Sequence, residues 1–592
     1  MCGIVGAVNC KNLKSFLLKG LKSLDYRGYD SAGVAYIEND VINMHRVVGR
    51  VELLENELSG PINSRIGIGH TRWATHGEPL IKNCHPQKSF HETFTLVHNG
   101  VIENYLELKR DLIKKGYAFT SDTDTEVIAN VIDKEYENTH DVLLSINNAL
   151  KIIDGSLAIA MIFKNDKEHL YFAKRKSPLL IGIGTDTNYL ASDALPMIKV
   201  AHKFIDLSDD QYGYISKDDV KIFKDQKECA YKYTTRNAEL LNIDLNGYPH
   251  YMLKEIEEIP ACMSRLIDNY YDGKEFKFSK EMLKAFKDAD TISFIACGTS
   301  YHASLIGKYY FEKINKRANV YIASEWAYFP KFESKGKEVF VMVSQSGETA
   351  DVISCMKLIK KHGNDTLTIT NTKGSTLERD ATYSCLLYAG VEIAVASTKA
   401  YNAQVALLYL LTNAIVENTS SIGLLKNNNI VLKQVISMKK DIKKIANKIK
   451  DSSHAFFLGR GLDYYVALEG SLKLKEITYI HSEAFPGGEL KHGPLALVEK
   501  GTPVFGFITN KCIEAAIRGN FSEVKARKGT VYSFVTKENA KKGDDIVIDD
   551  LDVDLAPLAI VMIAQYLAYY TALARNNDID KPRNLAKSVT VE

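Results

Sequence analysis

Apolar and polar positions alternate over short distances in the first 240 residues. Runs such as "GIVGAV", "SAGVAYI", "SLAIAMIF" and "LYFAKR" are separated by Gly, Asn and Asp, as strands joined by turns require. Helical spacing occurs near residues 103–115 and 124–135. We therefore expect an α+β domain over residues 1–240, with stacked sheets covered by helices.

The pattern changes at about residue 250. Buried-strand runs such as "TISFIACGTS", "KEVFVMVSQSGE" and "DTLTITNT" alternate with long helical patterns over residues 301–316, 349–362 and 398–418. Alternating strands and helices predict parallel sheets wrapped by helices. Residues 241–284 are interpreted as a linker followed by a helix.

A weak internal repeat divides the second half. "SFIACGTSYHASLIGKYYFEKI" resembles "FFLGRGLDYYVALEGSLKLKEI", which aligns Gly298 with Gly461 and Tyr301 with Tyr464. The repeat predicts two α/β domains, at residues 285–425 and 445–575, followed by a tail at 576–592. The first copy has "SQSGET" after its second strand where the second copy has "VFGFITNK". A ligand of that turn is therefore expected in the first copy only.

Composition narrows the class of protein. A chain of 592 residues is too long for one core. With 75 basic and 73 acidic residues, the net charge of +2 gives no case for binding nucleic acid or a charged membrane. The apolar runs fall short of the ~20 residues of a membrane span, and the start of the chain lacks a signal-peptide pattern. Nine scattered cysteines without a CxxC pair argue against a disulfide framework or a zinc site and favour the reducing cytoplasm.

Cys2 directly follows the initiator methionine in "MCGIVG". A thiol needs a base to become a nucleophile. Once Met1 is removed, the α-amino group of Cys2 itself, with an ordinary pKa of about 8, could be that base. The alternative is a buried strand residue, and this stretch alone leaves both open.

Three other segments bear on that choice. "GHTRWATHGEP" places Arg72 in a turn after a strand, as a surface arginine or as a clamp for a carboxylate. "VHNGVIEN" places Asn99 and Gly100 just past another strand, where an amide and a backbone N–H can stabilise an oxyanion. "TSDTDTEVIA" places Asp124 at a helix start, as an N-cap or as a ligand for an ammonium group.

Together these segments resemble the glutamine amidotransferases of the N-terminal-nucleophile class, whose fold stacks antiparallel sheets. The resemblance implies that Cys2 attacks the side-chain amide of glutamine, releasing ammonia, and that Asn99 and Gly100 form the oxyanion hole. It assigns Arg72 to the α-carboxylate and Asp124 to the α-amino group of glutamine. Thr75, His76 and His85 fall in matching segments of the glutamine pocket.

"VSQSGETAD" is a second candidate site. Ser344, Ser346 and Thr349 form a strand-to-helix turn, which can hold a phosphate on backbone N–H groups and hydroxyls. The alternative is a capped turn. "ACGTS" adds Thr299 and Ser300 at the end of a neighbouring strand, the edge at which open α/β sheets bind ligands. Neither a Walker A loop nor a GxGxxG fingerprint is present, so ATP and NAD are not expected.

In "LEGSLKLKEITYI", Glu469, Lys473 and Glu476 share one helix face. They are either a solvated row of ion pairs or a site where a carboxylate moves protons. In "GGELKHGPLAL", His492 is either a loop residue or an acid/base group with a pKa near 6.5.

These segments resemble the double sugar-isomerase module. Joined to the first domain, they make the whole chain similar to the glutamine-dependent sugar-phosphate aminotransferases. The motifs are "MCGIVG", "LDYRGYDSAG", "GHTRWATHG", "HNGVIEN", "CGTSY", "SQSGETAD", "VASTKA", "GELKHGPLAL" and "PRNLAKSVTVE".

The resemblance implies that D-fructose 6-phosphate and L-glutamine become D-glucosamine 6-phosphate and L-glutamate, the first step of the hexosamine pathway, without metal or organic cofactor. Lys587 would form a Schiff base at C2 of the sugar. Glu476 would move the proton between C1 and C2 with help from Lys473, and His492, donated across a homodimer, would open the ring. The residues implied in sugar-phosphate binding are Thr299, Ser300, Ser344, Gln345, Ser346, Thr349, Val395 and Ser397.

Free ammonia needs a sheltered path, because ammonium is a poor nucleophile. The resemblance implies a channel gated by Trp73, with Arg27 and Tyr29 coupling the sites and the tail as a lid. Two departures from the family pattern stand out: Pro486 before "GELKHG", and residues 505–545 with the Lys-rich "KENAKKGDD".

Three rival interpretations remain. A sugar-phosphate sensor would carry a DNA-binding module and have no use for Lys587. An amidotransferase of another pathway would lack "SQSGET". A deglycase built from the same domains is least well separated, although the intact "KHG" and "NLAKSVTVE" favour the aminotransferase.

Overall fold

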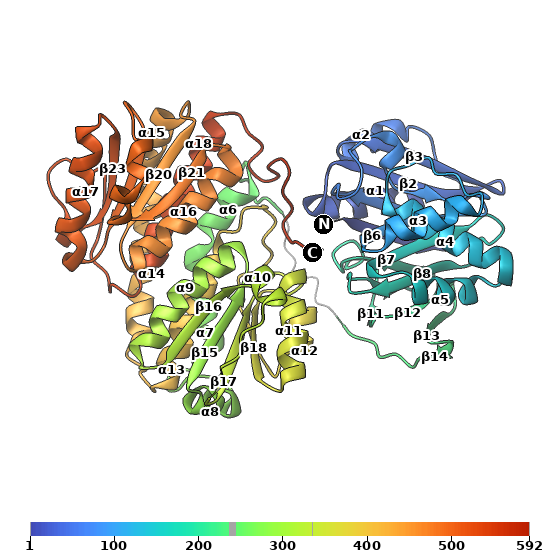
Figure 1. Cartoon of the computed structure of the whole chain (residues 1–592), viewed down its shortest axis with the longest axis horizontal. Coiled ribbons are helices and arrows are strands. Elements are labelled where there is room, and N and C mark those ends of the chain that lie inside the picture. Colours follow the sequence, from blue (N-terminus) through green and yellow to red (C-terminus); the bar gives the residue numbers. More distant parts are fainter. Residues whose placement is uncertain (1, 236–243, 334, 591–592) are drawn as a thin grey trace. The chain divides into compact units, whose positions relative to one another are not determined.

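The computed structural model describes residues 2–235, 244–333 and 335–590 (Figure 1). The chain divides into two compact units, one of Met1–Asn242 with Ala586–Glu592 and one of Ile243–Leu585. Residues 236–243, which span the predicted boundary between the first domain and the linker, lie outside the described residues. The helix expected after the linker is two helices, α6 (Tyr251–Glu257) and α7 (Ile259–Tyr270).

The described residues of the first unit form two seven-stranded antiparallel sheets, as the resemblance implied. One has the order β11-β9-β10-β1-β4-β2-β3 and the other β14-β13-β12-β8-β7-β6-β5. The strands of the first sheet are β1 Gly3–Val8, β2 Ser31–Glu38, β3 Val41–Val48, β4 Gly67–Arg72, β9 Leu180–Ile183, β10 Asn188–Ala191 and β11 Lys203–Asp206. Those of the second are β5 Gln87–Lys88, β6 Phe94–Ile102, β7 Gly155–Phe163, β8 Leu170–Arg175, β12 Gln211–Ile215, β13 Val220–Lys224 and β14 Lys227–Glu228.

Side-chain alternation along the strands builds four layers in this unit. In β1, Val5 and Ala7 pack in the core beneath the helices, whereas Ile4 and Val8 pack in the core shared by the two sheets. Successive residues of a strand face opposite ways, so a strand buried on both faces is apolar throughout. The helices are α1 Leu13–Leu24, α2 Val51–Glu57, α3 Tyr105–Lys114, α4 Asp124–Thr139 and α5 Val142–Ile152.

In the part of the second unit that the structure describes, two five-stranded parallel sheets have the orders β16-β15-β17-β18-β19 and β21-β20-β22-β23-β24. The strands are β15 Thr291–Ala296, β16 Arg317–Ile322, β17 Glu338–Val343, β18 Asp365–Thr370, β19 Tyr383–Leu386, β20 His454–Gly459, β21 His481–Pro486, β22 Pro503–Ile508, β23 Thr530–Thr536 and β24 Ile546–Ile548. The remaining α-helices are α8 Lys280–Asp288, α9 Gly298–Lys313, α10 Ala323–Tyr328, α11 Ala350–His362, α12 Thr376–Asp380, α13 Lys399–Ile415, α14 Ser421–Ser437, α15 Lys439–Ile449, α16 Leu462–Thr478, α17 Glu514–Ala526 and α18 Ala556–Ala574.

The internal repeat is visible in the backbone. Both sheets have the same strand order, and the aligned glycines Gly298 and Gly461 have φ angles of 53° and 56° where α9 and α16 begin. Glycine enters this left-handed region without a steric penalty, so each strand can turn sharply into its helix.

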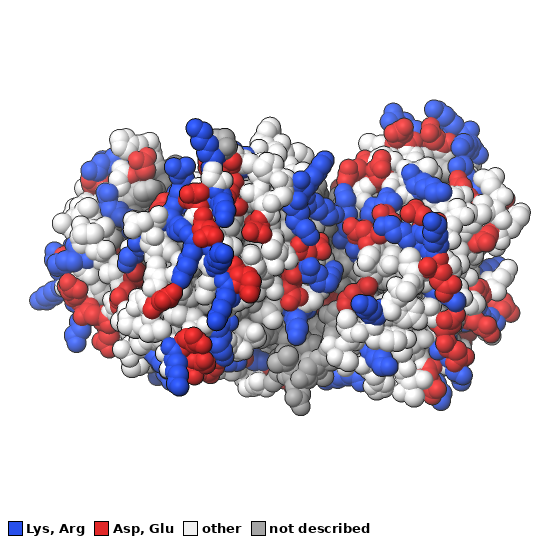
Figure 2. All heavy atoms as spheres, turned by 90° about the horizontal axis from the view of Figure 1, so that it is seen from below, with Lys and Arg blue, Asp and Glu red and all other residues white. Residues whose placement is uncertain are grey.

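Helix α18 corrects the expectation that no apolar run approaches a membrane span. It has 19 residues, and its mean hydropathy of 1.4 is high enough for one. However, 89% of its apolar window is buried inside the chain, against helices α15 and α16 among others. Its apolar character is explained by its place in the core of the second unit. On the face drawn in Figure 2, blue and red side chains are intermingled, in keeping with the nearly balanced charge.

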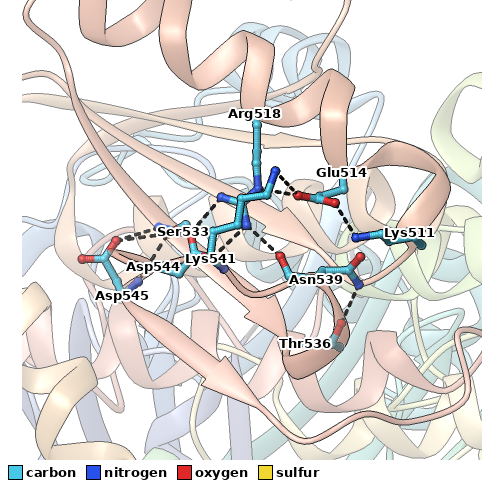
Figure 3. Close-up of polar contacts among 9 residues, drawn as sticks. All are labelled: Lys511, Glu514, Arg518, Ser533, Thr536, Asn539, Lys541, Asp544 and Asp545. Atoms are coloured by element: carbon cyan, nitrogen blue, oxygen red, sulfur yellow. Dashed lines mark hydrogen bonds and ion pairs between the residues drawn. The ribbon is translucent and has the colours of Figure 1, made fainter.

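The segment that departs from the family pattern completes the last sheet. Arg518 of α17 donates to both carboxylate oxygens of Asp544, at 3.0 and 2.8 Å, and to Glu514 at 2.9 Å (Figure 3). Hydrogen bonds, first from Lys511 and then from Lys541, hold the pKa of Glu514 down at about 2. These ion pairs hold residues 537–545, the segment "KENAKKGDD", against α17, directly before β24 begins.

Candidate functional site

Cys2 lies where β1 begins, next to the end of β4. The register pairs Gly3 with Thr71, which brings Cys2 to the residues after it. Its Sγ accepts the N–H of Trp73 at 3.3 Å and lies 3.6 Å from the Trp73 carbonyl oxygen. Burial raises the pKa of the Cys2 thiol. The thiol therefore depends on a nearby base to react.

Arg72 is 3% exposed, so it is not the surface arginine that one interpretation offered. Its Nη2 donates to the carbonyl oxygens of His76 and of Gly77, the latter at 3.0 Å, while its Nη1 is buried without a hydrogen-bond partner. A buried guanidinium is costly unless an anion meets it. No ion pair of Arg72 with a carboxylate occurs among the described residues, which suits a ligand carboxylate.

Asp124 begins α4 but does not cap it. The N-cap is Thr123, whose hydroxyl accepts the N–H of Glu126 at 3.3 Å. Asp124 instead accepts the N–H of Ile102 at 3.0 Å, and its carboxylate lies 3.9 Å from Nδ1 of His76. Thr75, in the turn after β4, is exposed.

Asn99 and Gly100 lie inside β6, not past its end as the sequence suggested. The strand continues because β6 and β7 pair as far as Ile102 and Gly155. Gly100 has a φ of 140°, and an added Cβ would meet Ser156 O at 2.0 Å, so only glycine fits. The Asn99 amide Nδ2 donates to the carbonyl of Cys2 at 2.9 Å.

His70 orients that amide, a role that the sequence did not reveal. Its Nε2 lies 2.9 Å from the His98 carbonyl oxygen and 3.0 Å from Asn99 Oδ1, so this nitrogen carries the proton. Burial lowers the pKa of His70 to about 3, which keeps the ring neutral. His85 lies behind it, with Nδ1 3.2 Å from His70 Nε2 and Nε2 2.9 Å from Thr125 Oγ1. The sequence signal that could have identified His70 is its position two residues before Arg72 on the same strand, β4.

In the second unit, the predicted phosphate residues gather at the carboxyl edge of the first parallel sheet. Ser344 Oγ, after β17, lies 2.8 Å from Thr349 Oγ1 and accepts the Gly347 N–H at 3.1 Å. Ser346 Oγ accepts the Glu348 N–H at 3.2 Å. Ser300, in the first turn of α9, accepts Gln404 Nε2 at 2.9 Å.

The remaining sugar-binding candidates lie on neighbouring loops. The backbone carbonyl of Gln345 accepts the Asn371 N–H at 3.0 Å, and Val395 N–H donates to Asp580 O at 2.9 Å. Ser397 donates to Glu392 at 2.7 Å. Glu392, missed from the sequence, also accepts the N–H groups of Thr398 and Ala400, at 2.9 and 3.0 Å. The only sequence feature that could have identified Glu392 is that it is the single acidic residue within "AGVEIAVAST".

The carboxylates of α16 form a buried network, so the interpretation as a solvated row is wrong. Glu469 and Lys473 are completely buried, and Lys473 Nζ lies 3.4 Å from Glu469 and 2.6 Å from Glu476. Thr299 donates to Glu469 at 3.0 Å and accepts from Lys473 at 3.1 Å. Burial acts to lower the pKa of Lys473, but the carboxylates of Glu476 and Glu469 raise it overall.

Glu476 borders a cavity of about 420 Å³. The cavity is lined by Leu472, Lys475, Glu476, Tyr479, Arg583, Asn584 and Leu585. Leu585, which lines this cavity, is two residues before Lys587 in the chain. Lys587 itself falls in Ala586–Glu592, the segment grouped with the first unit. Tyr479 was not predicted from the sequence.

The other predicted residues are placed as follows. His492 is exposed in the 3₁₀ turn Glu489–His492. Pro486 is the last residue of the edge strand β21, a position where proline is tolerated. Arg27 forms an ion pair with Asp193, and the Arg50 guanidinium lies 5.7 Å from the ring centre of Tyr29.

Comparisons with known proteins match the chain to two domain families and to full-length relatives. The glutamine amidotransferase domain family matches residues 77–198, and the SIS domain family matches residues 285–414 and 448–575. The isomerizing glutamine–fructose-6-phosphate aminotransferases of Bacillus licheniformis and Listeria innocua are 44% and 45% identical, each over all of both chains. Among solved structures, the C-terminal domain of glucosamine–fructose-6-phosphate aminotransferase from Francisella tularensis is 37% identical, with a TM-score of 0.55, and covers 57% of this chain and 100% of its own.

The fold and these matches define a glutamine amidotransferase joined to a pair of sugar-isomerase domains. More narrowly, the chain belongs to the isomerizing glutamine–fructose-6-phosphate aminotransferase family.

Proposed function

We propose that this chain converts D-fructose 6-phosphate and L-glutamine to D-glucosamine 6-phosphate and L-glutamate. The observation that carries the proposal is the buried pair of Glu469 and Lys473 next to Glu476, which borders a cavity together with the C-terminal segment. A base next to a cavity, with an ammonium fixed behind it, suits proton transfer between adjacent carbons of a sugar.

Cys2 is the nucleophile of the glutamine half-reaction. Its thiolate attacks the amide carbon, the C–N bond breaks, ammonia leaves, and water hydrolyses the thioester to glutamate. Asn99 Nδ2 already points to Cys2, and with the Gly100 N–H it stabilises the oxyanion. The unpartnered Nη1 of Arg72 takes the α-carboxylate of glutamine, and Asp124 takes its ammonium group.

The sugar half-reaction begins with phosphate binding. The hydroxyls of Ser344, Ser346 and Thr349 lie at the start of α11, where backbone N–H groups favour an anion. The C2 carbonyl condenses with Lys587 to an imine, and ammonia displaces the lysine. Glu476 then carries the proton between C1 and C2.

The remaining roles follow the family pattern. Residues 1–240 hold the glutamine site, residues 285–425 and 445–575 the isomerase domains, and residues 576–592 the tail that carries Lys587. The protein works in the cytoplasm as a homodimer in which the partner supplies His492 to open the ring. Trp73, hydrogen-bonded to Cys2, gates the ammonia path, with Arg27 and Tyr29 coupling the sites.

The test is incubation with glutamine and fructose 6-phosphate, followed by assays of glutamate and amino sugar. Formation of both, in equal amounts, is expected. Glutamate without amino sugar would contradict the assignment. Intact mass should show that Met1 is absent, and Cys2→Ser should lose glutamine hydrolysis.

A further inference from the structure

His302 lies on α9, one turn after Thr299, and meets the carboxylate network of α16. Its Nδ1 is 2.8 Å from Glu469 Oε2, and its side chain is 14% exposed. Residues three apart on a helix share a face, which explains why Thr299 and His302 both reach Glu469.

The two oxygens of Glu469 have different partners. Oε2 meets His302, whereas Oε1 accepts the Thr299 hydroxyl at 3.0 Å and lies 3.4 Å from Lys473 Nζ. A buried carboxylate needs its lone pairs satisfied. Since an ionised carboxylate only accepts, Nδ1 of His302 carries the proton and donates it.

Lys473 is shared between two carboxylates. It lies 2.6 Å from Glu476 and 3.4 Å from Glu469, so the closer pair is with the residue that borders the cavity. This division depends on Glu469 having a second donor, because without one its carboxylate would draw the ammonium toward itself.

We propose that His302 is a positioning residue for the sugar reaction, holding Glu469 so that Lys473 stays paired with Glu476. This inference rests on the proposed function, in which Glu476 moves the proton. The ammonium of Lys473, 2.6 Å from Glu476, favours the charged form of that carboxylate, which is the form that a base requires. Loss of the His302 donor would therefore raise the pH at which Glu476 becomes active.

Other charged groups surround this network and stay constant in the test. Glu392, before α13, is one of the carboxylates that raise the pKa of Lys473 against the effect of burial. Burial, and then the charge of Glu469, raises the pKa of Tyr401 in α13. Lys475 and Arg583 line the cavity with Glu476. The test leaves all of these groups in place and removes only the imidazole of His302.

The test compares His302→Leu with His302→Asn, since the asparagine Nδ2 can stand where Nδ1 donates. His302→Leu should lower kcat for amino-sugar formation about ten- to hundredfold, as expected for a lost hydrogen bond to a charged group. KM for fructose 6-phosphate should change less than about threefold. The acidic limb of the kcat–pH profile should move up by about one unit. His302→Asn should keep kcat within about threefold of wild type and leave the limb in place.

His481→Leu is the matched control, because its side chain is 72% exposed and its Nε2 lies 3.7 Å from Glu483 in the same unit. It should match wild type in kcat and in pH profile. If the His302→Leu profile does not shift, or His302→Asn falls as far as His302→Leu, the inference is overturned. Failure of the wild-type chain to make amino sugar would count against the proposed function instead. Melting curves establish that each variant is folded, and His302→Ala takes the place of His302→Leu if the leucine variant does not fold.

Discussion

The guanidinium of Arg583 lies over the ring of Tyr479, 4.1 Å from its centre, and the Tyr479 hydroxyl accepts the Arg583 backbone N–H at 2.9 Å. Tyr479 follows α16, three residues after Glu476. The C-terminal segment is thus held at two points beside the cavity that Glu476 borders. Lys587 stands four residues further along the chain, so this contact limits where its amine can reach.

In the proposed reaction, Tyr479→Ala should therefore weaken imine formation at Lys587. A cation–π contact contributes about 0.5–2 kcal/mol and the hydrogen bond about 1 kcal/mol, so amino-sugar formation should fall roughly tenfold. Tyr479→Phe keeps the ring and should lose less. The measurement is borohydride reduction in the presence of fructose 6-phosphate, with the mass increase on the Lys587 peptide read out. Equal trapping in wild type and Tyr479→Ala would show that the contact does not position the tail.

His70→Leu should impair glutamine hydrolysis through Asn99. Without the Nε2–H donor, the amide loses the bond that aims its Nδ2 at Cys2. Removal of one oxyanion donor costs about 10²–10³ in kcat, which sets the upper limit of the effect. KM for glutamine should hold, since Arg72 and Asp124 are untouched.

A double-mutant cycle with Asn99→Ala separates this role from a general loss of structure. In the Asn99→Ala background, His70→Leu should cost almost nothing further, because the group that it orients is gone. Full additivity of the two losses would mean that His70 acts by another route. His70→Gln, which can place an N–H near the same oxygen, should recover part of the rate.

Ser344→Ala should raise KM for fructose 6-phosphate and spare glutamine binding. A hydrogen bond to a charged group contributes about 1.5–3 kcal/mol, so the expected rise is roughly ten- to hundredfold. Ser437→Ala, at the end of α14 with its hydroxyl on the Gln434 carbonyl, is the control. An unchanged KM in Ser344→Ala would place the phosphate elsewhere.

The layered fold could be predicted from the sequence because apolar residues recur with the period of the strand or helix whose face they bury. The strand "GIVGAV" and the aligned glycines Gly298 and Gly461 were both found from the sequence alone. The position of Asn99 inside β6 was not, because strand pairing with β7 decides where the strand ends.

Contacts between segments far apart in the chain could not be predicted from the sequence either. Nothing in the spacing of Glu469 and Lys473 distinguishes a solvated face from a buried one, and only the packing of α16 against α9 and α18 settles it. His70, His302 and Tyr479 were missed for the same reason, since each acts through a partner far along the chain.

Asp463 supplies a prediction about stability in the second copy. By the alignment of Gly298 with Gly461 it takes the place of Ser300, and its carboxylate accepts the backbone N–H and hydroxyl of Thr509 at 2.9 and 2.6 Å. Burial raises the pKa of Asp463 to about 6, with the Thr509 hydrogen bonds opposing. An acid whose pKa is raised in the folded state stabilises the fold least when ionised, so stability falls as pH rises from about 4 through 6.

Asp463→Asn should therefore melt at a higher temperature than wild type at pH 8. Its free energy of unfolding should be larger by up to ~3 kcal/mol, because the pKa of Asp463 is raised by about two units. The difference should vanish near pH 4, where the wild-type carboxyl is protonated. The amide can still accept the Thr509 N–H and donate to its hydroxyl. Melting temperatures from pH 4 to 8 test this, with the exposed Asp549→Asn as control. A difference between variant and wild type that is the same at every pH would show that folding does not raise the pKa of the Asp463 carboxyl.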